Sequence, residues 1–90
     1  MQLRISRAAR ADLIRLHDWL ADIDVAVAGD AQLAIARKLA LLKNYPALGS
    51  PLPDGRRKLS VPRYGYLIFY RRTGSVIVIS RIVHAREDWR

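Results

Sequence analysis

Basic side chains and one histidine gather in the last third of this 90-residue sequence. Cleavage of RNA without a metal requires a group that exchanges protons, and cations that stabilise the negative charge developing on phosphorus. Histidine suits proton exchange near neutral pH, and His84 lies near these cations, whereas His17 lies in the first helical segment. The cations that could serve beside it are Arg57, Lys58, Arg63, Arg81 and Arg86. We take His84 with Arg81, Arg86 and Lys58 as the candidate catalytic set.

The same basic segment could instead bind an acidic partner without performing chemistry. From Arg56 to Arg90, nine Lys or Arg face two acidic residues, a net charge of +7, whereas residues 1–55 have seven basic and six acidic residues, a net charge of +1. Such a concentration attracts nucleic acid, ribosomes, anionic lipid or acidic proteins, and cations beside an aromatic side chain are frequent interface hot spots. The candidates for target binding are Arg57, Lys58, Arg63, Arg81, Arg86, Trp89 and Arg90. A solvated basic surface without a dedicated ligand is the alternative.

Several of these residues also have a simpler structural interpretation. A histidine at the end of a central strand often only hydrogen-bonds to the backbone, and we favour this role for His84 over proton transfer. Arg71 and Arg72 are expected to hold the end of a hairpin in water. Trp19 lies one residue off the apolar stripe of the first helix and is expected to flank the core.

The composition argues against several classes of protein. Cysteine is absent, which rules out disulfides and thiolate chemistry and fits a reducing cytoplasm. Apolar runs such as Val76–Ile79 are far too short to span a bilayer, so we expect a soluble cytoplasmic protein with no membrane partner. Two distant histidines and scattered carboxylates give no metal site. With no Gly-rich phosphate loop and no Ser/His/Asp set, we expect no cofactor and no small-molecule substrate.

The first half of the sequence predicts a strand followed by two helices. Residues 1–6 alternate in polarity like a strand, and Ser6 could cap a helix whose apolar residues recur every three or four positions. These residues are Ala9, Leu13, Leu16, Leu20, Ile23 and Val27. A second helix runs to about Lys43, with the apolar stripe Ala28, Ala31, Ile35, Leu39 and Leu42. The break falls within Asp22–Ala28, so the two helices must form an antiparallel hairpin.

The second half predicts strands. Proline and glycine residues between Pro46 and Gly55 end the second helix, and Gly49 and Gly55 are interpreted as turn residues. Three strands follow at Lys58–Val61, Tyr66–Arg71 and Val76–Val83, separated by a turn at 62–65 and a four-residue hairpin loop at 72–75. The third is apolar on both faces and is expected to be central. We therefore predict an α+β fold: an N-terminal strand, an antiparallel helical hairpin, and a three-stranded antiparallel C-terminal part of one sheet.

Four segments in this order resemble the RelE/ParE superfamily of bacterial type II toxins, and its ParE-like branch more than its RelE-like branch. The first is Leu3-Arg4-Ile5-Ser6, which leads into a helix containing Ala9, Asp12, Leu13 and Trp19. The others are Leu42 to Gly49 (LKNYPALG), Arg57 to Val61 with Tyr64 to Arg71 (RKLSV and YGYLIFYR), and Ile79 to Trp89 (ISRIVHAREDW). The resemblance covers residues 1–90 as a single RelE/ParE-like toxin domain.

The resemblance implies a small toxin that a cognate antitoxin neutralises in a heteromeric complex, with plasmid stabilization as an associated role. ParE-like members poison DNA gyrase and block replication, whereas RelE-like members cut messenger RNA in the ribosomal A site. One scaffold carries both activities, so only individual residues can separate them. An acidic antitoxin segment is expected to add to an open edge of the sheet or to dock as an amphipathic helix.

The end of the chain favours the ParE-like activity. RelE-like enzymes combine Lys and Arg of the sheet with a Tyr or His near the C-terminus. Here His84 is the only candidate, because a Tyr is missing from the terminal segment and Trp89 stands there, whose indole cannot transfer a proton at neutral pH. The resemblance therefore implies a poison that binds gyrase without being an enzyme. The alternatives are a ribosome-dependent mRNA endoribonuclease and a nontoxic member that acts only in the antitoxin complex.

Overall fold

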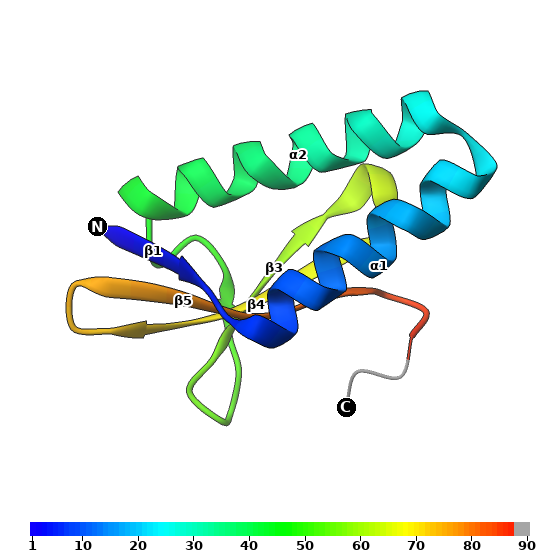
Figure 1. Ribbon diagram of the computed structural model, residues 1–90. Helices are drawn as coiled ribbons and strands as arrows, with labels where there is room; N and C mark the ends of the chain where they lie inside the picture. Colours follow the sequence, from blue (N-terminus) through cyan, green and yellow to red (C-terminus); the bar gives the residue numbers. More distant parts are fainter. Residues whose placement is uncertain (88–90) are drawn as a thin grey trace.

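The fold was analysed in a computed structural model, which describes residues 1–87. Two helices lie over a five-stranded sheet (Figure 1). The elements in chain order are β1 (Gln2–Ile5), α1 (Arg7–Ile23), α2 (Val25–Asn44), β2 (Ser50–Pro51), β3 (Arg57–Val61), the 3₁₀ turn η1 (Pro62–Tyr64), β4 (Tyr66–Thr73) and β5 (Val76–His84). The expected α+β fold is thus confirmed. The predicted target contacts at Trp89 and Arg90 lie outside the described residues.

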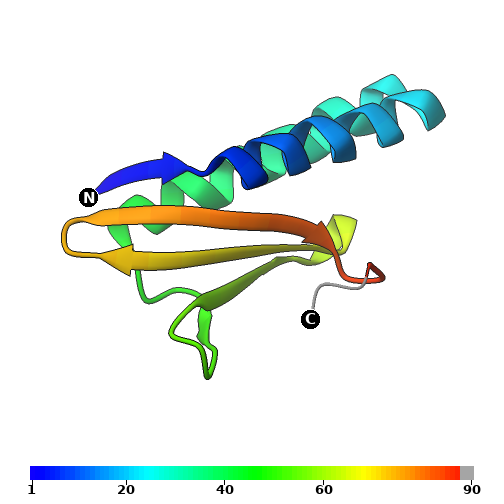
Figure 2. The ribbon, with the colours of Figure 1, turned by 60° about the horizontal axis from the view of Figure 1, so that its bottom comes forward.

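The sheet has the strand order β1-β5-β4-β3-β2. Strand β1 runs parallel to β5 and pairs Gln2–Ile5 with Val76–Ile79, whereas the other neighbours are antiparallel. Strand β5 is therefore central, as predicted. Both helices cover one face of the sheet, and the segment around β2 lies on the other side (Figure 2). The helix-free face of the sheet is thus covered in part by the segment around β2.

Side-chain caps fix the helix boundaries. The Ser6 hydroxyl accepts a hydrogen bond from the Ala9 N–H at 3.0 Å, as an N-cap residue does. Asp24 ends α1 and also caps α2, because its carboxylate accepts hydrogen bonds from the N–H groups of Ala26 and Val27. A one-residue connection forces the helices into the antiparallel hairpin that the sequence predicted. Because the break falls at Asp24, Ile23 lies on the exposed side, which corrects its assignment to the apolar stripe.

The core has one large and one small part, on opposite faces of the sheet. The large part joins the helices to the sheet and includes Leu16, Ile35, Ile68 and Ile79. The small part lies on the helix-free face and consists of Leu67, Phe69 and Val83, with Leu52 packed against it. Alternation along β4 sends neighbouring side chains to opposite faces, which explains why all five residues from Tyr66 to Tyr70 are buried.

Three local predictions were wrong. The hairpin loop is two residues shorter than expected, because β4 continues to Thr73 and β5 begins at Val76; Gly74 then supplies the positive φ of 59° that the tight turn needs. The short strand β2 was not expected, since Ser50–Pro51 has no strand pattern of its own and owes its conformation to pairing with β3. Val27 belongs to α2 and is largely exposed.

Gly49 does more than turn the chain. Its N–H donates to the Tyr70 hydroxyl at 2.7 Å, and that hydroxyl donates to the Pro46 carbonyl at 2.9 Å. A Cβ at position 49 would lie 2.8 Å from the Tyr70 ring and 3.0 Å from the Lys58 carbonyl oxygen. Glycine is therefore required by close approach. Tyr70 fastens the connection after α2 to the middle of the sheet and sets where β3 begins.

Candidate target-binding surface

Asp12 organises the end of α1 that meets β5. It is 4% exposed, and its Oδ2 accepts hydrogen bonds from the Arg81 Nε at 2.7 Å and the Ile82 N–H at 2.9 Å. Its Oδ1 accepts from the Nη2 atoms of Arg81 at 3.0 Å and Arg15 at 3.2 Å. Strand β1 ends at Ile5, so it does not reach this part of β5, and the Asp12 carboxylate satisfies the Ile82 N–H there.

The Asp12 carboxylate stays ionised at neutral pH. Burial alone would raise its pKa, but the hydrogen bonds from Arg81, the Ile82 N–H and Arg15 outweigh burial and hold the pKa below its ordinary value. The same pair raises the pKa of Arg81, chiefly through the hydrogen bond to Asp12. Arg81 is thus held by a bidentate ion pair with its side chain still about half exposed.

Glu87 closes the turn that follows β5. Its Oε1 accepts the His84 N–H at 2.9 Å and the Arg15 Nη1 at 3.0 Å, so the turn is tied to α1. Burial would raise the pKa of Glu87, but the hydrogen bonds from the His84 N–H and Arg15 lower it overall. Arg15 therefore bridges Asp12 and Glu87, and the residues between His84 and Glu87 are held close to the helix.

His84 is built into this turn. Its Nδ1 accepts the Arg86 N–H at 3.1 Å, and its ring packs edge-on against Tyr66 with the ring centroids 6.1 Å apart. Its Nε2 lies 3.0 Å from where a Cβ on Gly65 would stand, and Gly65 has a positive φ of 67°. These contacts give His84 the structural role that the sequence analysis favoured.

A hollow of about 490 Å³ lies beside the turn. It is lined by Arg15, Leu16, Trp19, His84, Arg86 and Glu87. Trp19 is 58% exposed, so the expectation that it flanks the core was wrong. Trp19 lies one residue off the apolar stripe of α1, so its side chain is rotated away from the core and lines this hollow. An exposed indole between two arginines has the composition of an interface hot spot.

The remaining predicted cations lie elsewhere. Arg57 donates to the carbonyls of Gly49 at 2.7 Å and Ala47 at 3.4 Å and so braces the loop before β3. Arg63 lies over the Tyr64 ring, 5.5 Å from its centroid. Lys58 pairs with Phe69 in the sheet register and shares its helix-free face. Among residues 1–87, the predicted target-binding residues do not form one patch: Arg81 lies in β5 and Arg86 in the turn after it, apart from Arg57, Lys58 and Arg63.

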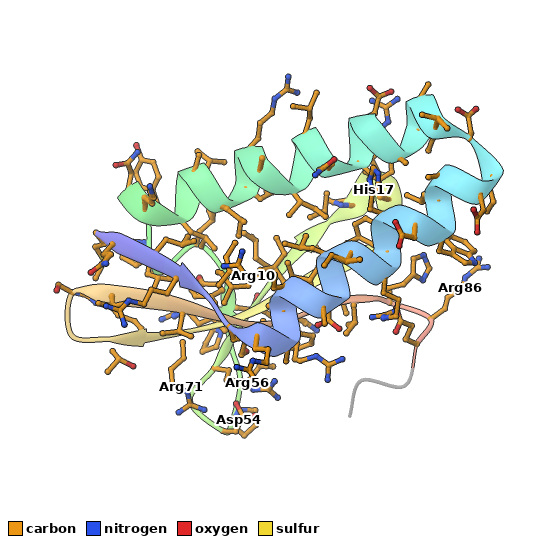
Figure 3. All side chains as sticks on the ribbon, viewed as in Figure 1. Arg10, His17, Asp54, Arg56, Arg71 and Arg86 are labelled. Carbon is orange, nitrogen blue, oxygen red and sulfur yellow. The ribbon has the colours of Figure 1, made fainter. Side chains whose placement is uncertain are left out.

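Arg72 supports the hairpin as expected, whereas Arg71 makes a different contact. Arg72 donates from Nε to the Gly74 carbonyl at 3.1 Å, which supports the hairpin as predicted. Arg71 instead reaches the Asp54 carbonyl at 3.1 Å, in the loop before β3. In Figure 3 its label lies beside those of Asp54 and Arg56. Arg56 bonds to the Asp54 carboxylate at 2.7 Å and covers the Phe69 ring at 5.0 Å.

Residues of the candidate catalytic set make other contacts or lie on different strands. Arg81 is paired with Asp12, which offsets the charge it could offer to a phosphorane, and His84 Nδ1 already accepts the Arg86 N–H. Lys58 belongs to β3, with β4 between it and the strand that carries His84. His17 lines a separate cavity of about 190 Å³ between the helices. Among residues 1–87, no three His, Asp or Glu side chains are grouped to hold a metal ion.

The comparisons with known proteins decide the family. The family described as ParE toxin of the type II toxin-antitoxin system parDE matches residues 3–89. The chain belongs to the ParE toxin family. Toxin RelE1 of Caulobacter vibrioides (strain ATCC 19089 / CIP 103742 / CB 15) is 30% identical over 86 residues, which cover 93% of this chain and 92% of the relative. The chain is the toxin component of a type II toxin–antitoxin system, as the resemblance implied.

A solved structure supports the same assignment for this ParE-family chain. The structure described as a chromosomal ParDE TA system from P. aeruginosa has a TM-score of 0.80 and 28% sequence identity, and it covers 96% of this chain and 97% of that one. The match identifies an antitoxin as the kind of partner to expect. Within the described part of the chain, neither helix is long and apolar enough to cross a membrane.

Four residues of this surface were not predicted as site residues from the sequence. Asp12, Arg15 and Glu87 are ordinary surface residues by type, and Trp19 looked like a core residue. One signal was available for Asp12: it lies three residues after Ala9 and one before Leu13, on the buried side of a helix that starts at Ser6. A carboxylate at such a position needs partners, and a neighbouring strand rich in arginine could supply them.

Proposed function

We propose that this ParE-family toxin inhibits DNA gyrase by binding and thereby blocks replication in the cytoplasm. The observation that carries the proposal is the surface around Trp19, where an exposed indole lies between Arg15 and Arg86 beside the turn after β5. A gyrase poison needs to favour the cleaved gyrase–DNA state by binding it better than the resealed state, and it requires no acid or base. The Asp12 and Glu87 ion pairs hold this surface rigid before the target arrives, which lowers the entropic cost of binding.

The predicted target-binding residues divide into two groups under this proposal. Arg86 lines the Trp19 surface, Arg81 is joined to it through Asp12 and Arg15, and the terminal residues Trp89 and Arg90 follow in the sequence. Arg57, Lys58 and Arg63 lie at other parts of the sheet, so we assign them no direct contact with gyrase at the Trp19 surface.

The antitoxin partner fits a different groove. A groove of about 440 Å³ runs between α2 and the end of β3, with Leu33, Leu41 and Tyr64 among its apolar lining residues. Arg37, Lys38 and Arg63 lie along it with one acid, Asp30. Strand β2 pairs only with Arg57 and Lys58, so the edge of β3 beyond them is open. We propose that an acidic amphipathic segment of the antitoxin binds here, because its charge and apolar side chains match both features.

A supercoiling and DNA-cleavage assay with purified gyrase tests the proposal. Added protein should lower supercoiling and cause cleaved DNA to accumulate, and cognate antitoxin should abolish both effects. Trp19→Ala should be weaker, whereas Ile14→Ala, which removes another exposed apolar side chain of α1, should behave like the unchanged protein. Full gyrase activity in the presence of folded protein would contradict the proposal.

Ribosome-dependent mRNA cleavage is the second candidate, because Toxin RelE1 is 30% identical to this chain. The catalytic set for that activity would be His84, Arg81, Arg86 and Lys58. Translating ribosomes mixed with the protein would give defined mRNA cuts if this activity exists, and His84→Ala would abolish them. Intact mRNA together with trapped gyrase–DNA cleavage complexes would exclude it in favour of gyrase.

A further inference from the structure

Cations on the helix-free face of the sheet stand in two rows. Leu3 and Ile5 pack toward the helices, so Arg4 between them projects to the opposite face. In the sheet register, Arg4 lies opposite Val78, and Val78 lies opposite Arg71. The first row therefore crosses β1, β5 and β4 and has an arginine at each end.

The second row crosses β3, β4 and β5. Lys58 lies opposite Phe69, and Phe69 lies opposite Arg81. Phe69 belongs to the core part on the helix-free face, so Lys58 and Arg81 flank it there. Strands are about 4.8 Å apart and same-face residues about 6.7 Å apart along a strand, so the backbone positions of the two cations in a row are roughly 10 Å apart and the rows roughly 7 Å apart.

A further cation, Arg56, and the carboxylate of Asp54 also lie on this face. Arg56 covers Phe69 from the loop before β3, with its guanidinium carbon 5.0 Å from the ring centroid. Asp54 pairs with Arg56, and Asp12 pairs with Arg81. Within residues 1–87, Arg56 and Arg81 are held in ion pairs, whereas Arg4 and Arg71 belong to no ion pair and leave this face positive. Figure 3 shows Arg56 and Arg71 on the loop side of the sheet, and Figure 2 shows both helices on the other side.

The apolar side chains that lie between these cations offer little exposed surface to an apolar ligand. Phe69 is 1% exposed and Val83 is 3% exposed, with Arg56 lying over the phenyl ring. Within residues 1–87, the apolar side chains of this face are buried and offer little surface to an amphipathic peptide, whereas a regularly charged backbone requires only cations spread over a shallow surface. This distinguishes the face from the groove beside α2, where apolar residues line the hollow.

We propose that this face binds the phosphates of duplex DNA, so that the toxin contacts the DNA segment that gyrase holds as well as gyrase itself. The choice of DNA among polyanions rests on the proposed gyrase function. The Trp19 surface and this face meet at Arg81, which pairs with Asp12 on one side and flanks Phe69 on the other. A toxin that contacts protein through one surface and DNA through the other would bind the cleaved complex better than gyrase alone.

The test measures DNA binding in the absence of gyrase, so it does not depend on whether gyrase is the target. Fluorescence anisotropy follows the unchanged protein and its variants on a labelled duplex over a range of salt concentrations. The face variant carries Arg4→Gln and Arg71→Gln, one at each end of the first row. The control variant carries Arg37→Gln and Lys43→Gln, which remove the same charge from α2. Thermal melting checks that both variants are folded.

The face variant should bind the duplex at least about tenfold more weakly, with a log–log salt slope smaller by roughly 2, because two phosphate contacts are lost. The control variant should change affinity by less than about threefold, since its lost charges lie away from the DNA. Equal weakening of both variants would overturn the proposal, because binding would then follow net charge alone. Stronger binding to single-stranded RNA than to duplex DNA, lost in the same face variant, would also overturn it. Loss of DNA binding in the face variant, with gyrase supercoiling unaffected by the unchanged protein, would support this inference and reject the gyrase function.

Discussion

Single residues decide what the end of β5 can do. Asp12 forms an ion pair with Arg81, and Glu87 forms one with Arg15, so the charges of both arginines are compensated. His84 is fixed by the Arg86 N–H and the Tyr66 ring. What remains presented at this end is an exposed indole, that of Trp19, beside the side chain of Arg86. The chemistry of the residues therefore favours recognition over catalysis.

Trp19→Ala should weaken gyrase inhibition by about tenfold or more, because an exposed tryptophan among arginines is a typical hot spot. The free energy of unfolding should change by no more than about 0.5 kcal/mol, since the side chain is 58% exposed. Inhibition titrations and urea denaturation measure the two quantities. Equal inhibition by Trp19→Ala and the matched Ile14→Ala would show that the Trp19 surface does not meet the target.

Asp12→Ala should lower the free energy of unfolding by roughly 2–4 kcal/mol, because it leaves the buried Ile82 N–H without its acceptor and Arg81 without its pair. Asp12→Asn keeps an oxygen for the Ile82 N–H and should cost less, roughly 1–2 kcal/mol. Asp18→Ala, at an exposed position of the same helix, serves as the control in urea denaturation. Indistinguishable values for all three variants would contradict the role given to Asp12.

The ion pair between Asp12 and Arg81 should also make the free energy of unfolding depend on pH in the acid range. The pKa of Asp12 is lower in the folded protein than in the unfolded chain, where it is about 3.9. The unfolded state therefore binds more protons between the two values, and stability present above about pH 4 is lost as the pH falls through the folded pKa. The difference in urea midpoint between pH 7 and pH 3 should be smaller in Asp12→Asn than in the unchanged protein. An equal difference in the two proteins would count against this pair as an acid-sensitive contact.

At the scale of elements, the order of strands and helices can be predicted from the sequence. The contacts that pack these elements together cannot. The Ser6 cap, a helix break within Asp22–Ala28 and the central β5 were predictable because caps and apolar periods are local signals. Strand β2 exists through its pairing with β3, and Asp12 completes the edge of β5 beyond Ile5. Such contacts join residues far apart in the chain, and no local pattern encodes them.

The same reason limits what the sequence predicts of the candidate site. It placed Arg81 and Arg86 at the end of β5 correctly as exposed cations, and it favoured a structural role for His84. It could not place Arg57, which turns away to hold the Gly49 carbonyl, or Trp19, whose exposure depends on what α1 packs against. A one-residue shift around a helix is about 100°, enough to move a side chain from the core to the surface.

Two glycine substitutions test how the elements are joined. Gly49→Ala should lower the free energy of unfolding by roughly 1–3 kcal/mol, because the added Cβ would press on Tyr70 and the Lys58 carbonyl. Gly29→Ala, inside α2 with nothing within 4 Å of the added Cβ, should raise it by roughly 0.5–1 kcal/mol through helix propensity. Urea denaturation gives both values. A neutral Gly49→Ala would mean that the Tyr70 contact does not fix the loop.

At the scale of the whole molecule, the proposed binding sites for the partners are three separate surfaces. The Trp19 hollow lies at the end of β5, the groove of Leu33 and Leu41 lies beside α2, and the two rows of cations lie on the helix-free face. With a charge of +8 over 90 residues, each surface favours an acidic partner. The antitoxin and the target can therefore differ in where they bind, and neutralisation need not require that they compete for the same side chains.

Saturating antitoxin should raise the melting temperature of the toxin by roughly 10–20 °C. A ligand at 100 times its Kd adds about 2.7 kcal/mol to the folded state, and each kcal/mol is worth about 4–8 °C in a domain of this size. Calorimetry with and without antitoxin measures the shift. Arg37→Glu should reduce this rise in melting temperature, because the groove would lose its attraction for acidic residues. Lys43→Glu serves as the control, since Lys43 does not line the groove. An unchanged melting temperature with excess antitoxin would contradict the groove assignment.

The most direct test of the account is the amount of cleaved DNA in a purified gyrase reaction to which this protein is added. The account predicts that cleaved DNA accumulates in proportion to toxin, that Trp19→Ala shifts the response to about tenfold higher concentrations, and that antitoxin abolishes it. If folded protein leaves DNA cleavage and supercoiling unchanged at saturating concentrations, the gyrase-binding account is wrong, and the ribosomal activity carried by His84 becomes the function to test.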